Sequence, residues 1–213
     1  MTKSTAIKYL ERMSIYTEID FILYKICFHA APTIHRVKPA SLICFYNSQT
    51  VRLKDMWDEY KHSIEELLPF QFREVKRCDK GVNVLFYWKD WMERIINNKK
   101  NSTYLNDMGY TETKGIEEVL DILSEHFKNG CPHEVGIFLG YPLSDVIAFS
   151  NGSNQDCLGV GYWKVYSNMP RAKKIFELYD KTHVHIIKSL ERGVNPQNLF
   201  QNVAMTRKTS QSA

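Results

Sequence analysis

Residues 27–42 read Cys27-Phe28-His29-Ala30-Ala31-Pro32-Thr33-Ile34-His35-Arg36-Val37-Lys38-Pro39-Ala40-Ser41-Leu42. The residues before this stretch follow a helical pattern, with apolar side chains at three- and four-residue spacings: Ile19, Ile22, Leu23 and Ile26. Pro32 suits the first turn of a helix, where its missing N–H goes unused and its fixed φ is already helical. The sequence therefore predicts a new helix that begins close to Ala30 and is kinked or ended by Pro39.

The same stretch resembles a known signature. Ala30-Ala31-Pro32-Thr33 is similar to the Cys-Gly-Pro-Thr or Cys-Ala-Pro-Thr motif of papain-like thiol enzymes, especially the bacteriocin-leader-processing type. The longer pattern, His29 to Thr33 with Lys38 to Leu42, resembles a bacterial family labelled domain of unknown function 3793, whose motif reads His-Cys-Ala-Pro-Thr. The resemblance implies a nucleophilic cysteine at the position of Ala30. The alanine is either natural in a non-nucleophilic member or a replacement that inactivates the protein, and we favour the replacement because the rest of the signature is kept.

Length and composition narrow the class of protein. The chain has 213 residues, 44% of them hydrophobic, which predicts a single domain over residues 1–203 and a disordered tail over 204–213. A formal charge of +4 without an arginine-rich run argues against nucleic acid and suits an acidic protein partner. No apolar run reaches the roughly 20 residues of a membrane span, and the N-terminal residues lack a secretory pattern. We expect a cytoplasmic protein that does not bind membranes.

The cysteines predict neither a disulfide framework nor a metal site. The chain has five, an odd count without a close pair: Cys27, Cys44, Cys78, Cys131 and Cys157. In a protein without an export signal this favours reduced thiols. Structural zinc usually needs paired ligands such as Cys-x-x-Cys, and this sequence has none. We therefore expect no cofactor and no metal.

The remaining elements follow from periodicity and turn signals. Helices are predicted over residues 5–28, 53–68, 90–96, 116–127 and 170–179, and strands over 70–75, 82–88, 135–139 and 159–166. Residues 182–190 are predicted to form one more element, whose type stays open. Residues 40–46 are apolar at nearly every position and fit a helix end or a strand, and 143–149 fit a short helix or a returning strand. Residues 97–102 are polar and predict a loop. Helices dominate the first half and strands gather later. The fold class is therefore α+β, which in the papain-like interpretation means a central helix near Ala30 on an antiparallel sheet with extra surface helices.

The resemblance also implies where a catalytic triad would lie. Papain-like enzymes place their histidine at the start of a strand far along the chain and the third member on a neighbouring strand. His133 fits the first role and Asp145 the second, with Glu134 and Asn151 as substitutes for Asp145. The alternative is that His133 and Asp145 only cap helices.

Other residues complete the predicted site. His29, His35 or the backbone N–H of Ala30 would stabilise an oxyanion, although His35 also fits a plain surface position. Trp163 lies in an aromatic stretch that fits the core or the wall of an acyl pocket. Cys131, two residues before His133, is a second candidate nucleophile.

The leading function that the resemblance implies is an acyltransferase. Papain-like homologues form amide bonds through a cysteine thioester in non-ribosomal antibiotic assembly, including polythioamide pathways. The implied partners are an acyl carrier protein with a thioester-bound acyl group and an amine acceptor, and hydrolysis by water would make the enzyme a peptidase or amidase. The alternative is a non-catalytic binding or regulatory protein in which Ala30 is natural.

Overall fold

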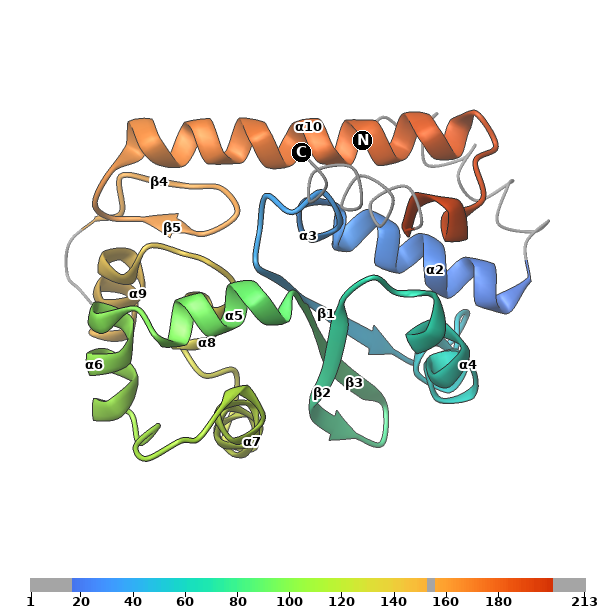
Figure 1. Cartoon of the computed structure of the whole chain (residues 1–213). Helices are drawn as coiled ribbons and strands as arrows, with labels where there is room; N and C mark the ends of the chain where they lie inside the picture. The colour runs from blue at the N-terminus through green and yellow to red at the C-terminus, as the bar shows by residue number, and fades with distance from the viewer. Residues whose placement is uncertain (1–16, 153–155, 201–213) are drawn as a thin grey trace, which may run out of the picture.

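The computed structural model describes residues 17–152 and 156–200 of the chain. The helices are α2 (Glu18–His29), α3 (Ala31–Ile34), α4 (Leu53–Leu67), α5 (Lys89–Ile96), α6 (Lys99–Asp107), α7 (Ile116–Phe127), α8 (Val135–Phe138), α9 (Leu143–Ser150) and α10 (Met169–Glu191). The strands are β1 (Ala40–Tyr46), β2 (Gln71–Cys78), β3 (Gly81–Tyr87), β4 (Gly159–Val160) and β5 (Lys164–Val165). The predicted α+β class is therefore confirmed (Figure 1).

A three-stranded antiparallel sheet in the order β1-β3-β2 forms the centre of the molecule. β3 is the central strand, and its Leu85 lies opposite Leu42 of β1 and Arg73 of β2. It is buried at almost every position because helices pack on both faces of the sheet. The hairpin between β2 and β3 turns at Asp79-Lys80, as its sequence predicts. Because the sheet is complete by Tyr87, the expectation that strands gather in the second half is wrong.

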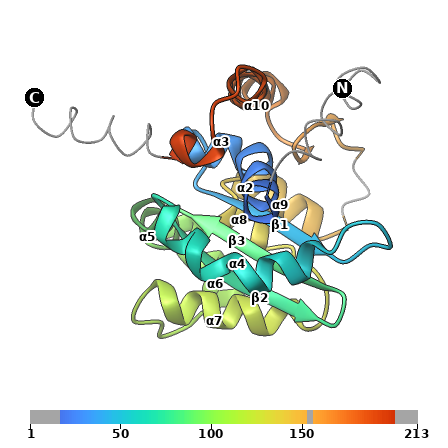
Figure 2. The same cartoon turned by 90° about the vertical axis from the view of Figure 1, so that its right-hand side faces the viewer.

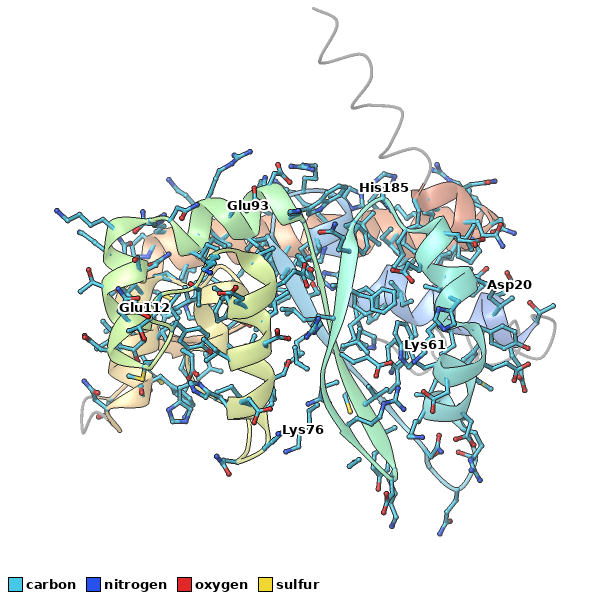
Figure 3. The ribbon with its side chains drawn as sticks, turned by 60° about the horizontal axis from the view of Figure 1, so that its bottom comes forward. Asp20, Lys61, Lys76, Glu93, Glu112 and His185 are labelled. Carbon is cyan, nitrogen blue, oxygen red and sulfur yellow. The ribbon has the colours of Figure 1, made fainter. Side chains whose placement is uncertain are left out.

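Helices cover both faces of this sheet (Figures 2 and 3). Val82, Val84 and Phe86 of β3 point into a core with α2, α3, α4 and α10, whereas Leu85 and Tyr87 point into a second core with α5 to α9. This alternation is the two-residue periodicity of a strand with both faces buried. Figure 3 shows the arrangement edge-on, with Glu93 and Glu112 on one side of the strands and Lys61 of α4 on the other.

A third, smaller core joins α10 to the hairpin of β4 and β5. It contains Trp163, Val165, Ala172 and Tyr179, and α10 runs from this hairpin across α3 to α2 (Figure 1). Gly161 is required at the hairpin turn because a Cβ there would lie 2.2 Å from the Phe176 ring of α10. α10 therefore ties the hairpin to the α2 and α3 layer.

Several predicted elements differ from the structure. The helix predicted to begin close to Ala30 is α3, but it has only four residues and ends at Ile34, before Pro39, and the chain enters β1 at Ala40. Residues 135–139 form the short helix α8 where a strand was predicted, and the predicted loop over 97–102 contains the start of α6, which Asn98 caps by accepting from Lys100 and Asn101. The strand predicted over 159–166 is two strands of two residues. The helix predicted over 170–179 continues through the element predicted over 182–190 as the single helix α10. Residues 5–16 of the first predicted helix and the predicted tail over 204–213 lie outside the described residues.

Candidate functional site

Ala30, the position predicted for the nucleophile, lies inside the core of the α2 side. Its side chain is 0% exposed, and its N–H donates to the Ile26 carbonyl at 2.8 Å as the last hydrogen bond of α2. Its own carbonyl accepts from Ile34 at 2.8 Å. The N–H that an oxyanion hole would need is therefore already bonded, and Ala30 is both the C-cap of α2 and the N-cap of the four-residue helix α3.

The rest of the Ala-Ala-Pro-Thr signature also has structural contacts. The Thr33 and Ser41 hydroxyls are hydrogen-bonded at 2.8 Å, and the Trp88 indole N–H donates to the Thr33 carbonyl at 2.6 Å. All three residues are buried. These hydrogen bonds replace the ones that the polar groups would make to water in the unfolded chain. These contacts join α3 to β1 and to the end of β3.

The pocket that gathers most of the predicted site residues lies on the other side of the sheet. It has a volume of about 530 Å³, within the range typical of small-molecule sites, and we call it the Trp163 pocket. The segment before α8, the two short helices α8 and α9, and the β4–β5 hairpin form its walls. The apolar lining residues are Pro132, Val135, Gly136, Tyr141, Val146, Phe149, Val160, Gly161 and Trp163, and the polar ones are Cys131, His133, Asp145 and Lys164.

Aromatic rings define the interior and the mouth of the pocket. Trp163 stacks on Tyr141 with 5.0 Å between the ring centroids, and both rings line the cavity. At the mouth, Phe149 is 42% exposed and Val160 is 71% exposed. These two exposed apolar side chains extend the apolar surface of the cavity to the outside of the molecule.

Asp145 is a buried anchor of the hairpin. It is 2% exposed, its Oδ2 accepts from the Trp163 indole N–H at 2.8 Å, and its Oδ1 accepts from the backbone N–H groups of Tyr166 and Ser167 at 3.0 and 2.9 Å. Three donors satisfy both carboxylate oxygens. Asp145 thus holds Trp163 and β5 against α9.

His133 and Asp145 line the same pocket, but the structure gives no hydrogen bond between them. The His133 ring instead packs edge-on against Phe149, with 4.9 Å between the centroids. Cys131 also lines the pocket, where desolvation and the nearby Glu134 carboxylate raise the pKa of its thiol and disfavour the thiolate. Glu134, the substitute triad member, is buried and accepts from His126 at 2.5 Å and from Tyr110 at 3.1 Å.

The structure therefore divides the predicted site between the two sides of the sheet. His133, Asp145 and Trp163 meet at the Trp163 pocket, whereas Ala30 packs with α2, α3 and β1 in the opposite core. His29 is exposed at the end of α2, where its ring lies against Phe28. His35 is half-buried and hydrogen-bonded to the Ala31 carbonyl and to His185 of α10.

Lys38 has an unusual environment beside the pocket. Its side chain is 9% exposed, and its ammonium lies 5.5 Å from the centroid of the Tyr141 ring and 5.9 Å from that of Tyr179 on α10. Burial lowers the pKa of Lys38 to about 8. Within residues 17–152 and 156–200, no carboxylate pairs with this ammonium and no acceptor is hydrogen-bonded to it.

Sequence reasoning did not select Lys38, Tyr141 or Phe149 as site residues. A signal for Lys38 exists, since it directly precedes Pro39 and the mostly apolar residues of 40–46. Tyr141 and Phe149 carry no comparable signal, because aromatic residues beside apolar runs most often belong to a core.

Comparison with known proteins assigns a family to the chain. The model of a family described as "Protein of unknown function (DUF3793)" matches residues 26–200. The chain belongs to this family, as the resemblance of its first motif implied. Neither a curated protein nor a solved structure matches the chain.

Two further observations concern membranes and metal ions. Of the helices in the described ranges, none is long and apolar enough to cross a membrane. Over the same part of the chain, no three His, Cys, Asp or Glu side chains are grouped so that they would hold a metal ion.

Proposed function

We propose that this chain is a binding protein that takes an apolar organic group, an acyl chain or a ring, into the Trp163 pocket. The observation that carries this proposal is the pocket itself, a cavity of about 530 Å³ with two stacked aromatic rings inside and exposed Phe149 and Val160 at its mouth. Transfer of apolar ligand surface from water into such a cavity is the main source of affinity at small-molecule sites.

The environment of Ala30 favours binding over catalysis from this position. A residue that is 0% exposed, with its N–H bonded within α2, neither reaches a substrate nor stabilises an oxyanion. The papain-like relationship and the acyltransferase function, with its carrier-protein and amine partners, stay predictions that an experiment at position 30 tests. The two functions share one feature, since an acyl group is also what an acyltransferase would hold beside Trp163.

The proposal is tested by calorimetric titration of the protein with 1-octanol, an apolar probe without charge. We expect saturable binding with one site, and we expect Phe149→Ser and Val160→Ser each to weaken it, by about tenfold for the larger Phe149 side chain. Both residues are exposed, so these substitutions leave folding intact.

The matched control is Leu178→Ser, because Leu178 is an exposed apolar residue on α10 that does not line the pocket. It should bind 1-octanol as tightly as the unaltered protein. Absence of saturable binding, or equal weakening by all three substitutions, would contradict the proposal.

A further inference from the structure

Lys38 carries a largely buried positive charge, and no carboxylate among residues 17–152 and 156–200 forms an ion pair with it. The cation–π contacts with Tyr141 and Tyr179 compensate only part of the lost hydration, and neither ring brings a negative charge. A buried ammonium in this state either loses its proton or gains an anionic partner.

The same charge lies directly behind one wall of the Trp163 pocket. Tyr141 contacts the Lys38 ammonium and also lines the cavity. The backbone fixes this proximity, because Gly140, with φ +80°, approaches so closely that a Cβ would lie 2.7 Å from Cδ of Pro39. Lys38 and Tyr141 therefore flank a tight contact between two loops.

Two lysine charges, those of Lys38 and Lys164, and one carboxylate, that of Asp145, surround the cavity, so its formal charge is net positive. Among the described residues, Asp145 is the only carboxylate that lines the pocket, and three hydrogen-bond donors already occupy its oxygens. Lys164 at the mouth adds a second positive charge, with its ammonium 5.5 Å from the Phe149 ring. The cavity thus combines apolar walls with a positive electrostatic potential.

We infer that Lys38 selects ligands with a carboxylate group, so that the Trp163 pocket takes a monocarboxylic acid with an apolar chain. This inference rests on the proposed binding function and names the chemical class of its ligand. Direct contact is not required, because a unit charge within about 10 Å through protein changes the affinity for an anion by roughly tenfold.

The inference predicts a dependence on pH. Binding of a carboxylate favours the protonated form of Lys38, and burial lowers the pKa of this group to about 8, so affinity for the anion falls as pH rises through that value. Affinity for a neutral ligand is not linked to this proton. The other titratable or charged groups that face Lys38 or the cavity are Tyr141, Tyr179, Cys131, His133, Asp145 and Lys164.

The experiment compares octanoate, 1-octanol and octylammonium by calorimetric titration at about pH 7 and about pH 9.5, with the full chain. The variants are Lys38→Met and Lys164→Met, which remove one cation each. We expect the unaltered protein at the lower pH to bind octanoate about tenfold more tightly than 1-octanol and to bind octylammonium most weakly. Lys38→Met should bind octanoate and 1-octanol equally, while Lys164→Met, which removes an exposed and screened charge, keeps most of the preference.

Each outcome decides between the claims. Saturable binding of 1-octanol without a preference for octanoate overturns the role of Lys38 and leaves the proposed function intact, whereas no binding of any probe overturns the proposed function. If Lys164→Met loses the preference for octanoate over 1-octanol and Lys38→Met keeps it, then Lys164 at the mouth selects the carboxylate, and the inference is contradicted. If Lys38→Met does not fold, the unaltered protein decides, because a preference that is constant between the two pH values overturns the inference.

Discussion

Lys38 also affects stability in a way that needs no ligand. The lowered pKa means that the folded protein binds this proton more weakly than the unfolded chain does. The protonated side chain therefore destabilises the fold below about pH 8, and this cost is relieved as pH rises from about 8 to about 10.5, the ordinary lysine value.

We predict that Lys38→Met unfolds with a weaker dependence on alkaline pH than the unaltered protein. The difference in the free energy of unfolding between the two should change by up to about 3 kcal/mol between about pH 7 and pH 10, with the variant relatively more stable at the lower pH. Urea denaturation at both pH values measures it. The comparison cancels the titrating groups that do not contact Lys38, which both proteins share, and a difference independent of pH would show that Lys38 is not a buried cation.

At position 30, the structure and the acyl-transfer prediction give opposite expectations. In Ala30→Cys the new thiol would be as buried as Cys27, so we expect native protein to be alkylated by iodoacetamide at this residue at least roughly tenfold more slowly than at the exposed Cys44, Cys78 and Cys131. Mass mapping of a time course measures the rates, and labelling in denaturant shows that every thiol reacts once exposed.

The opposite result would restore the thiol-enzyme interpretation. An active nucleophile at position 30 would be labelled first, because an imidazole or a helix N-terminus favours the thiolate. It would also need His133 close by, so His133→Ala in the same background should slow its labelling. Labelling at position 30 that is fast and sensitive to His133 contradicts a purely structural role for this position.

Among the elements, the β4–β5 hairpin depends most on a single side chain. Each strand has only two residues, too few for the ladder to hold by itself, and Asp145 of α9 supplies three hydrogen bonds that fix Trp163 and the end of β5. This hairpin forms one wall of the pocket, so the position of Trp163 depends on a buried carboxylate.

We predict that Asp145→Asn destabilises the protein by about 2 kcal/mol or more. The amide keeps one accepting oxygen, but its NH2 group replaces the other oxygen and faces at least one of the three donors, which leaves a buried polar group unpaired. Thermal unfolding measures the loss. The matched control, Asp156→Asn, changes an exposed aspartate near the same hairpin and should unfold like the unaltered protein. Equal stability of both variants would show that Asp145 is not an anchor.

The elements that sequence reasoning predicted correctly are those with an unambiguous period or turn. The amphipathic pattern of α4 and α7 and the Asp79-Lys80 turn each specify one local structure. Val135 to Leu139 is different, because a continuous apolar run of five residues fits a strand or a buried helix equally well, and its packing on α5 and α9 decides for helix. α10 continues through Asp180-Lys181 because both residues are compatible with a helix and solvated on its outer face.

At the scale of the whole molecule, the predicted site residues are separated because their helices cover opposite faces of the sheet. The order of Ala30, His133 and Asp145 along the chain fits a papain-like arrangement, but order does not state which face of the sheet each segment covers. In this fold α2 and α3 cover one face, and α8 and α9 pack on the other. The non-local pairing of β1 with β3 and the packing of the helices on the sheet fix these faces, and no local motif encodes them.

The most direct test of the central claim, that an apolar ligand enters the Trp163 pocket, uses the indole N–H signals of the four tryptophans, Trp57, Trp88, Trp91 and Trp163. The indole of Trp163 donates to Asp145 at the pocket wall, whereas those of Trp57 and Trp88 donate to Glu74 and to the Thr33 carbonyl away from it. In a ¹H–¹⁵N NMR titration with octanoate, we predict that the Trp163 signal shifts and saturates while the other three stay in place. A Trp163 signal that does not move, or an equal shift of another indole, would contradict the claim.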